Sequence, residues 1–322
     1  MPVSPEQALK FKETFDALAA NINTAILGKD HVVRLALTCL LSEGHLLLED
    51  APGVGKTSLA RALANTVQGT QARIQFTPDL LPSDVTGVQV YDQHTGRFTF
   101  VPGPIFHSIV VADEINRASP KTQSALLEVM EEGRVTVDGQ PHHVPRPFMV
   151  IATQNPIEQS GTYPLPEAQL DRFLMKTSVG YPDHEATVAL LHDSARRDRT
   201  ADLKPVIVAD ALPQLSRLAD HVTVRPEVLG YVSALATATR EHRHVKLGVS
   251  PRGALAYVRC AKTWAISQGR REVIPDDIML LAKPVLGHRV ILTDEADYDG
   301  VTVDAVIDEI LRQVPAPLVR VA

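Results

Sequence analysis

Residues 49–58, Glu-Asp-Ala-Pro-Gly-Val-Gly-Lys-Thr-Ser, combine closely spaced glycines with a lysine and a hydroxyl side chain. An apolar run precedes them and a helical pattern follows, which predicts a strand, a tight loop and a helix. The backbone N–H groups of such a loop and the positive end of the helix can surround a polyphosphate. Lys56 would then reach the β- and γ-phosphates, and the Thr57 hydroxyl would hold Mg²⁺. The candidate cofactor-binding residues of this loop are Pro52, Gly53, Val54, Gly55, Lys56, Thr57 and Ser58.

The match to the strict phosphate-loop pattern G-x-x-x-x-G-K-[ST] is imperfect, because Asp50 stands where the first glycine belongs. On the loop alone, a chance Gly-x-Gly-Lys-Thr sequence in an ordinary turn therefore stays open as an alternative. The chemistry must be supported by residues elsewhere in the chain.

Asp113 and Glu114 follow an apolar run at residues 108–112 that shows no alternation. Such a run is typical of a central strand in a parallel sheet covered on both faces, and ligands bind at the carboxyl ends of these strands. Asp113 would hold Mg²⁺, and Glu114 would orient and deprotonate an attacking water. The alternative is two surface carboxylates at a strand end.

Two further candidates lie at the ends of predicted elements. Asn155 follows a second apolar run, residues 148–152, and would position the water or the γ-phosphate; the alternative is a turn-forming asparagine before Pro156. Gly28 and Lys29 separate two helical patterns close in sequence to the phosphate loop, and would wrap an adenine base. A simple turn between helices explains these two residues equally well.

The elements that must position these residues alternate between strand and helix through residue 181, which predicts an α/β P-loop core with a parallel sheet. From residue 183 onward helical patterns dominate. We therefore expect a nucleotide-binding core at residues 1–182 and an all-helical domain at residues 183–322 that includes the connecting segment. A hairpin-like insertion is predicted between residues 78 and 105, and a second hairpin with an Asp-Gly turn is predicted at residues 135–140.

Composition restricts the function classes. The chain has 322 residues, 44% of them hydrophobic, which is enough for two domains. Its net charge of −6 and the scarcity of Lys and Arg in both insertions make nucleic acid an unlikely partner. Cys39 and Cys260 lie in apolar helical patterns, which predicts buried thiols and a reduced, cytoplasmic setting. The start of the chain lacks a secretory pattern and no apolar run is long enough for a membrane span, so membrane insertion is not expected.

His142 and His143 are adjacent and could be read as metal ligands. No Cys, Asp or Glu stands at a supporting spacing nearby, so we predict surface or loop histidines instead.

Three segments, residues 113–118 (Asp-Glu-Ile-Asn-Arg-Ala), 152–156 (Ala-Thr-Gln-Asn-Pro) and 165–173, together resemble the MoxR family of AAA+ ATPases, in the helix-2-insert clade. Residues 49–53, 101–104 and 250–253 add to the resemblance, which extends from about residue 28 to beyond residue 286. In that family an aspartate or another residue can occupy the first-glycine place. Asp50 is therefore consistent with the family, although it departs from the generic pattern.

The resemblance implies ATP and Mg²⁺ as cofactors and a role for each candidate. Residues 53–57 would form the Walker A loop, Asp113 and Glu114 the Walker B pair, and Asn155 the first sensor. Arg172 falls at the arginine-finger position, reaching a neighbouring subunit's γ-phosphate, and Arg252 at the second-sensor position in a helical lid. The catalytic set is thus Glu114, Asn155, Arg172 and Arg252. A salt bridge within the chain is the alternative for Arg172, and a solvated first-turn arginine is the alternative for Arg252.

The same resemblance implies Mg²⁺-dependent ATP hydrolysis at the subunit interfaces of a homo-oligomeric ring, expected to be a hexamer. The ring would remodel or mature partner complexes in a chaperone-like way, together with proteins that carry von Willebrand factor A domains. Residues 79–101 would be the helix-2 insert and residues 135–144 a pre-sensor hairpin. Three alternatives stay open: the ATPase subunit of a metal chelatase, a nucleic-acid-dependent motor or loader, and a non-catalytic nucleotide switch.

Overall fold

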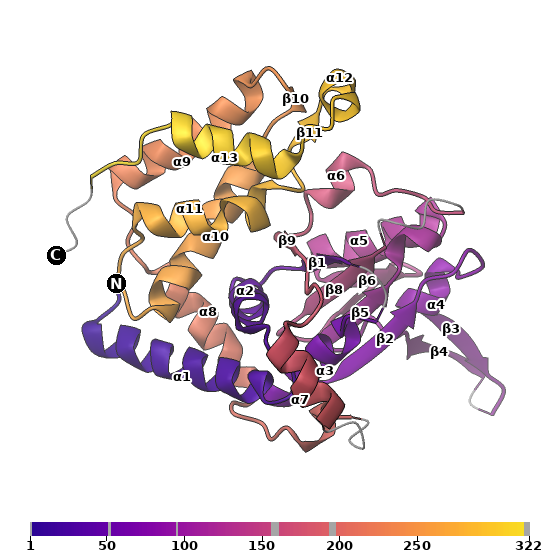
Figure 1. Ribbon diagram of the computed structural model, residues 1–322. Coiled ribbons are helices and arrows are strands. Elements are labelled where there is room, and N and C mark those ends of the chain that lie inside the picture. Colours follow the sequence, from indigo (N-terminus) through magenta and orange to yellow (C-terminus); the bar gives the residue numbers. More distant parts are fainter. Residues whose placement is uncertain (1, 51–52, 95, 156–160, 193–197, 319–322) are drawn as a thin grey trace. The chain divides into compact units, whose positions relative to one another are not determined.

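The computed structural model describes residues 2–50, 53–94, 96–155, 161–192 and 198–318, and the chain divides into two compact units (Figure 1). The first, here called the sheet unit, contains residues 17–172 and 177–213. The second, the helical unit, contains residues 1–16, 173–176 and 214–322. The boundary expected after residue 182 therefore lies inside the sheet unit, because helix α7 (His184–His192) and the chain that follows it, up to residue 213, group with the sheet.

A parallel sheet forms the centre of the sheet unit, as predicted. Its strands are β1 (Leu46–Glu49), β2 (Gln71–Gln75), β5 (Ile109–Asp113) and β8 (Met149–Gln154), paired in parallel, and the full strand order is β2-β5-β8-β1-β9. Strand β9 (Met175–Thr177) begins in residues that are grouped with the helical unit. Every residue of β5 is buried, which is why its sequence shows no alternation. The register places Asp113 opposite Gln75 and Glu49 opposite Gln154. Polar residues at the carboxyl ends of neighbouring strands therefore meet at one edge of the sheet.

The helices of the sheet unit connect these strands. They are α2 (Asp30–Leu41), α3 (Lys56–Thr66), α4 (Pro82–Thr86), α5 (Pro120–Glu132), α6 (Glu167–Leu170) and α7, with short 3-10 turns at Ile115–Arg117, Thr200–Asp202 and Ala209–Ala211. Helix α1 (Pro5–Asn23) contributes to both units. Helix α5 shows how local residues set where a helix begins and ends. The Ser119 hydroxyl accepts the Thr122 N–H, Pro120 occupies the first turn, and Gly133 ends the helix at φ +65°.

Both predicted insertions are antiparallel hairpins. Strands β3 (Gly87–Asp92) and β4 (Arg97–Pro102) form the first, which extends away from the central sheet in Figure 1. Strands β6 (Arg134–Val137) and β7 (Gln140–His143) form the second. The His142 ring stacks on Phe100 of the first hairpin, with centroids 3.9 Å apart, whereas His143 is exposed. Both histidines lie in strand β7 and not in a loop, and His142 is half-buried because its ring packs on Phe100.

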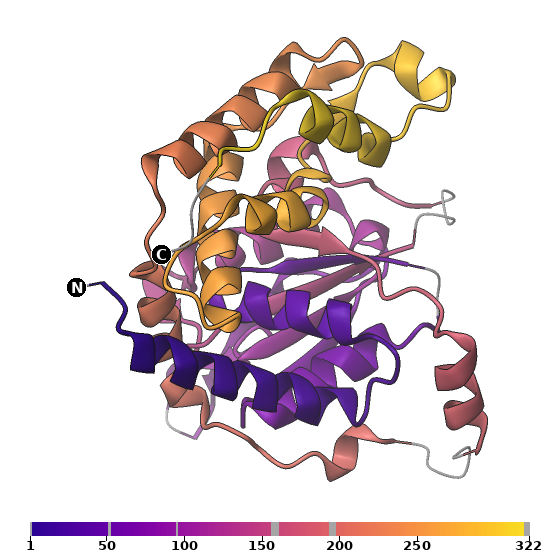
Figure 2. The same ribbon diagram turned by 60° about the vertical axis from the view of Figure 1, so that its left-hand side comes forward.

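The helical unit is built from α8 (Leu212–Asp220), α9 (Pro226–Glu241), α10 (Pro251–Ser267), α11 (Pro275–Leu286), α12 (Asp294–Tyr298) and α13 (Val303–Gln313). A two-stranded antiparallel pair, β10 (Val245–Leu247) and β11 (Ile291–Leu292), accompanies the helices. Helix α10 packs against α9 and α11, the orange and gold helices of Figure 2. Among the described residues, no helix has both the length and the apolar run that crossing a membrane requires.

The two thiols are buried, as predicted, and neither is part of a disulfide among the described residues. Cys39 lies in α2 and Cys260 in α10. Burial raises the pKa of the Cys260 thiol to about 12, so this thiol stays protonated and unreactive in the folded protein.

Two polar side chains after α11 are buried in the helical unit. The Arg289 guanidinium donates to the backbone oxygens of Phe173 (2.7 Å) and Leu174 (3.2 Å). His288 Nε2 lies 2.9 Å from the same Phe173 oxygen. Burial, together with the neighbouring Arg289 charge and the Lys176 charge, holds the pKa of His288 well below its usual range. His288 is therefore neutral in the folded protein.

We expect the helical unit to lose stability as the pH falls through about 6.5, the pKa of an unfolded histidine. Below that pH the unfolded chain binds a proton that the folded His288 does not, so the free energy of unfolding falls by up to about 1.4 kcal/mol per pH unit. Fluorescence of Trp264, the single tryptophan and a residue of α10, follows denaturant unfolding of this unit. His288→Gln should flatten the pH slope between pH 7.5 and 5.5. Equal slopes for both proteins would contradict the assignment.

Candidate functional site

The loop between β1 and α3 has the backbone that a phosphate cradle needs. Gly53 and Gly55 adopt φ of +84° and +97°, a region that residues with a side chain rarely enter. Val54 lies between them, and Pro52 lies outside the described residues. Helix α3 begins at Lys56, so the N–H groups of Lys56, Thr57 and Ser58 have no acceptor within the helix. These donors and the positive end of α3 make the loop an anion-binding element.

Asp50 holds the start of this loop in place. Its side chain is buried, Oδ1 accepts the Gly180 N–H at 3.0 Å, and Oδ2 accepts the Val179 N–H at 2.5 Å. The Asp50 carbonyl oxygen in turn accepts from Lys56 Nζ at 2.9 Å. The residue that departs from the generic glycine pattern is thus an anchor, because a glycine would leave both of these backbone donors without their acceptor.

The Asp113 carboxylate is the meeting point of three elements. Its side chain is only 9% exposed, and Oδ2 lies 3.4 Å from Thr57 Oγ1 of α3. The same oxygen accepts from Arg73 Nε of β2 at 2.6 Å. Oδ1 accepts from the Thr153 hydroxyl of β8 at 3.1 Å. The carboxylate that sequence reasoning assigned to metal therefore stands beside the predicted hydroxyl ligand, Thr57, and is held by an arginine from the neighbouring strand.

Glu114 is held both at its backbone and at its side chain. It adopts a left-handed backbone, φ +56° and ψ +49°, and its N–H donates to the Thr153 hydroxyl at 2.9 Å. Glu114 Oε2 accepts from Gln75 Nε2 at 2.9 Å and from Arg117 Nη1 at 3.0 Å. A non-glycine residue in this conformation is strained by about 1 kcal/mol or more, and such strain is common at functional sites. The carboxylate of Glu114 is therefore aimed by its surroundings.

A single cavity of about 330 Å³ joins these groups. It is lined by Gly53, Gly55, Lys56, Thr57, Ser58, Arg73, Gln75, Asp113, Glu114, Thr153 and Asn155. The structure thus brings together most of the loop residues, both acidic residues and the asparagine that were predicted from sequence. Backbone donors and Lys56 line the cavity opposite two carboxylates, which suits a polyphosphate with a metal ion and a general base.

Sequence reasoning missed Arg73, Gln75 and Thr153. Arg73 and Gln75 are two positions apart on β2, so both side chains leave the same face of the sheet. The signal that could have found them is a pair of polar residues two positions apart on a strand that neighbours the strand ending in Asp113. The strand order that makes β2 the neighbour of β5 was not visible in the sequence.

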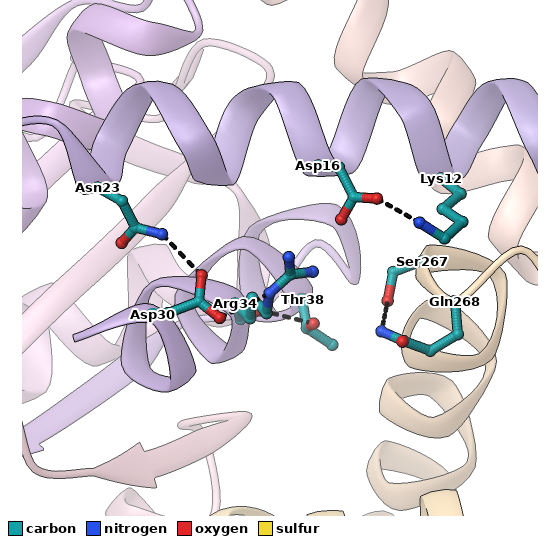
Figure 3. Close-up of polar contacts among 8 residues, drawn as sticks. All are labelled: Lys12, Asp16, Asn23, Asp30, Arg34, Thr38, Ser267 and Gln268. Atoms are coloured by element: carbon teal, nitrogen blue, oxygen red, sulfur yellow. Dashed lines mark hydrogen bonds and ion pairs between the residues drawn. The ribbon is translucent and has the colours of Figure 1, made fainter. Parts of the chain in front are cut away.

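Gly28 and Lys29 do not line this cavity. Gly28 has φ +69°, and a Cβ there would lie 2.9 Å from the Ala186 Cβ of α7. Lys29 Nζ donates to the Tyr181 carbonyl oxygen at 2.5 Å. Figure 3 shows how the ends of the two flanking helices are joined, since Asn23 donates to Asp30 at 2.6 Å. This tight turn explains the glycine, and contact with an adenine base stays a prediction.

The two predicted arginines lie on different units. Arg172 Nη2 is 3.1 Å from Glu131 Oε2 of α5, with 27% of the arginine side chain exposed. The ion pair that sequence analysis left open for Arg172 therefore exists in the single chain; a half-exposed pair of this kind contributes about 1 kcal/mol at most. Arg252 is exposed in the first turn of α10, in the helical unit.

Comparison with known proteins agrees with this geometry. Residues 45–175 match the family described as "ATPase family associated with various cellular activities (AAA)", and residues 237–310 match the AAA lid domain. A nucleotide-binding α/β core of this type followed by a helical lid defines an AAA+ P-loop ATPase. The crystal structure of an inferred ATPase from Cytophaga hutchinsonii aligns with a TM-score of 0.90 at 35% identity, covering 97% of this chain and 98% of that chain.

Relatives in sequence identify the family. The chain is 49% identical over 302 residues to the uncharacterized protein YeaC of Bacillus subtilis strain 168, covering 94% of each chain. It is 40% identical over 316 residues to the chaperone MoxR1 of Mycobacterium tuberculosis, covering 95% of this chain and 83% of the relative. The chain therefore belongs to the MoxR family of AAA+ ATPases, as its motifs implied.

The Asp50 anchor yields a test. We expect Asp50→Gly, which restores the generic loop pattern, to lower the free energy of unfolding by about 2–4 kcal/mol, because the buried N–H of Val179 and the part-buried N–H of Gly180 lose their acceptor. Asp50→Asn keeps one acceptor oxygen and should cost less. Urea unfolding followed by far-UV circular dichroism measures both. Wild-type stability of the glycine variant would contradict the anchoring role.

Proposed function

We propose that this protein is a Mg²⁺-dependent ATP hydrolase whose active sites are completed at the subunit interfaces of a ring, expected to be a hexamer. The observation that carries the proposal is the cavity in which loop donors, Lys56, Asp113 and an oriented Glu114 converge. Phosphoryl transfer to water needs a phosphate cradle, a metal ligand and a base placed within a few ångströms of one another.

The residues around Asp113 fit a magnesium ion. The Thr57 hydroxyl and the Asp113 carboxylate are hard oxygen ligands 3.4 Å apart, the kind of donors Mg²⁺ prefers. When bound, the ion would neutralise negative charge on the phosphate oxygens. Arg73 bonds the same Asp113 oxygen, so it must swing away for the metal to bind, and its half-exposed side chain leaves room for that movement.

Glu114 is proposed as the general base and Asn155 as the residue that holds the attacking water or the γ-phosphate. Glu114 Oε2 accepts from Gln75 and Arg117, and these two donors hold the carboxylate in place at the cavity. To take a proton from water, this oxygen must give up one of these bonds. Gln75, which is neutral, is the weaker partner and the one we expect to be released.

Arg172 is proposed to act on a neighbouring subunit's γ-phosphate, and Arg252 to sense the nucleotide from the lid. A guanidinium delivered by the neighbour supplies positive charge where negative charge develops, and makes hydrolysis depend on assembly. Within a single chain Arg172 is kept oriented by Glu131. The exposed part of the Arg172 side chain is the part that would contact the nucleotide of a neighbouring subunit.

The ring is proposed to remodel or mature partner complexes in a chaperone-like way. The β3–β4 hairpin offers it a contact surface: its exposed apolar residues are Val88, Val90, Tyr91, Phe98 and Val101. Resemblance to the family suggests partners with von Willebrand factor A domains, which co-purification with the tagged full chain would test. Recovery of a porphyrin-metallating partner instead would favour the chelatase alternative.

A nucleic-acid motor is the second candidate. The exposed rings of Tyr91 and Phe98, with centroids 5.2 Å apart, could stack bases. Arg97 is the single Lys or Arg of this hairpin, which is too little charge to track a phosphate backbone. Stimulation of hydrolysis by DNA or RNA would favour this candidate over protein remodelling.

The central test is the ATP hydrolysis rate per subunit as a function of protein concentration. We expect the rate to rise with concentration, and Glu114→Gln and Arg172→Ala to lower turnover by about 10³-fold or more while ATP binding persists. A rate independent of concentration, together with an active Arg172→Ala protein, would overturn the shared-site ring.

Glu131→Gln is the matched control for Arg172. It breaks the ion pair within the chain but leaves the guanidinium in place. We expect turnover to be kept or raised. Loss of turnover equal to that of Arg172→Ala would show that the pair itself, and not a finger, is what hydrolysis requires.

Arg73 gives a separate test of the metal ligand. In a Glu114→Gln background, Arg73→Gln should lower the Mg²⁺ concentration needed for half-maximal binding of a fluorescent ATP analogue by about 2- to 5-fold, since a half-exposed ion pair contributes up to about 1 kcal/mol. Arg61→Gln, which breaks the exposed Arg61–Asp198 pair on α3, is the control and should change nothing. An unchanged Mg²⁺ requirement for Arg73→Gln would contradict competition at Asp113.

A further inference from the structure

The Arg289 guanidinium is buried although its described hydrogen bonds go mainly to backbone oxygens. Only 6% of the residue is exposed, and the guanidinium donates to the carbonyl oxygens of Phe173 (2.7 Å), Leu174 (3.2 Å) and Val285. Burying a charged group is costly unless it is well bonded, so its position is closely determined by these carbonyls. Two of them belong to the residues that directly follow Arg172 in the chain.

The other side of Arg289 packs against the start of α10. A Cβ at Gly253 would lie 2.7 Å from the Arg289 Cδ and 2.9 Å from a Val249 methyl carbon, so only glycine leaves room for the arginine. Gly253 directly follows Arg252, and its N–H is held by the Ser250 hydroxyl at 3.0 Å in the helix cap. Arg289 therefore contacts the turn of helix that carries Arg252.

His288 reinforces the contact with Phe173. Its Nε2 lies 2.9 Å from the oxygen that also accepts from Arg289 Nη2. Arg289 Nη1 lies 2.8 Å from the same His288 Nε2, so the two side chains and the Phe173 carbonyl form one polar cluster. The backbone at Phe173 is thereby held from two adjacent residues.

We propose that Arg289 is a positioning residue that fixes the backbone after Arg172 to the start of the helix bearing Arg252, so that the two arginines respond to nucleotide together. This inference rests on the proposed function, which assigns both arginines to the nucleotide. The planar guanidinium is needed because it reaches Phe173 and Leu174 from one fork, whereas a lysine offers a single point of attachment. The described hydrogen bonds of Arg289 go to Phe173, Leu174, Val285 and His288, so its proposed effect passes through the backbone.

The test uses Arg289→Lys, which keeps the positive charge but loses the fork. We expect kcat to fall about 10- to 100-fold through misplacement of the arginines, while the dissociation constant for ATP stays within about 2-fold. In an Arg172→Ala background, Arg289→Lys should lower kcat by a clearly smaller factor than in the wild type, because one of the two arginines that it positions is gone. Full additivity of the two substitutions would overturn the proposal.

Hydrogen exchange supplies a readout that does not depend on turnover. In Arg289→Lys, peptides covering residues 172–177 and 250–255 should exchange faster together, about 10-fold or more, since both lose the same support. Gly253→Ala keeps the guanidinium but displaces it, and should also speed hydrogen exchange in these two peptides. This variant replaces Arg289→Lys in the experiment if the lysine variant does not fold. Acceleration of one peptide without the other would overturn the proposal.

Arg270→Lys is the matched control. Arg270 also forms a bidentate pair in the helical unit, with Asp277 at 2.7 and 2.5 Å, and none of its described bonds involves residues 172–177 or 250–253. We expect lower stability of the unit with unchanged kcat and no selective exchange at the two segments. If Arg172→Ala keeps wild-type turnover, the proposed function fails, while the exchange experiment still decides whether Arg289 joins the two segments.

Discussion

The arrangement of the candidate site depends on one nearly buried carboxylate. Asp113 sits at the end of the central strand β5 and is bonded from three other elements, through Thr57 of α3, Arg73 of β2 and Thr153 of β8. A carboxylate in this position must be paired, because an uncompensated buried charge costs several kcal/mol. The pairing therefore fixes where the loop helix and both neighbouring strands lie relative to one another.

The same constraint organises Glu114. Thr153 bonds both the Asp113 side chain and the Glu114 N–H, so one hydroxyl positions both the proposed metal ligand and the proposed base. The left-handed backbone at Glu114 turns the chain sharply. Asp113 and Glu114 are consecutive, yet their carboxylates contact different residues, Arg73 and Gln75. Gln75 and Arg117 then hold the carboxylate that this turn presents.

Positive charge is used in three different ways in this protein. Lys56 bonds the carbonyl oxygen of Asp50 at the phosphate loop, where it can transfer to a phosphate. Arg73 bonds a carboxylate that a metal ion would claim, so its contact is exchangeable. Arg289 is buried and donates to the backbone carbonyl oxygens of Phe173 and Leu174. The half-exposed Arg73 is placed to change partners, whereas the buried Arg289 supports the backbone.

The sequence alone predicted most of the secondary-structure elements and the residues that meet at the candidate site. The glycine loop before α3 needs φ values that few residues other than glycine adopt, and the apolar strand before Asp113 shows no alternation because both of its faces are buried. Both requirements concern the backbone conformation or burial of a few consecutive residues, so they can be recognised from the residue types in that segment. The motif residues around them were enough to indicate the family that the comparisons confirmed.

Only the tertiary structure decided which distant residues meet. The neighbour of β5 is β2, and that strand order places Arg73 and Gln75 at the acidic pair. Asp50 proved to be an anchor because the chain after β9 returns to it, and Gly28 is required by close packing on Ala186. Arg289 reaches residues more than a hundred positions away. Such contacts depend on how the elements pack against one another, and this packing cannot be read from periodicity, helix or strand propensity, or motif spacing.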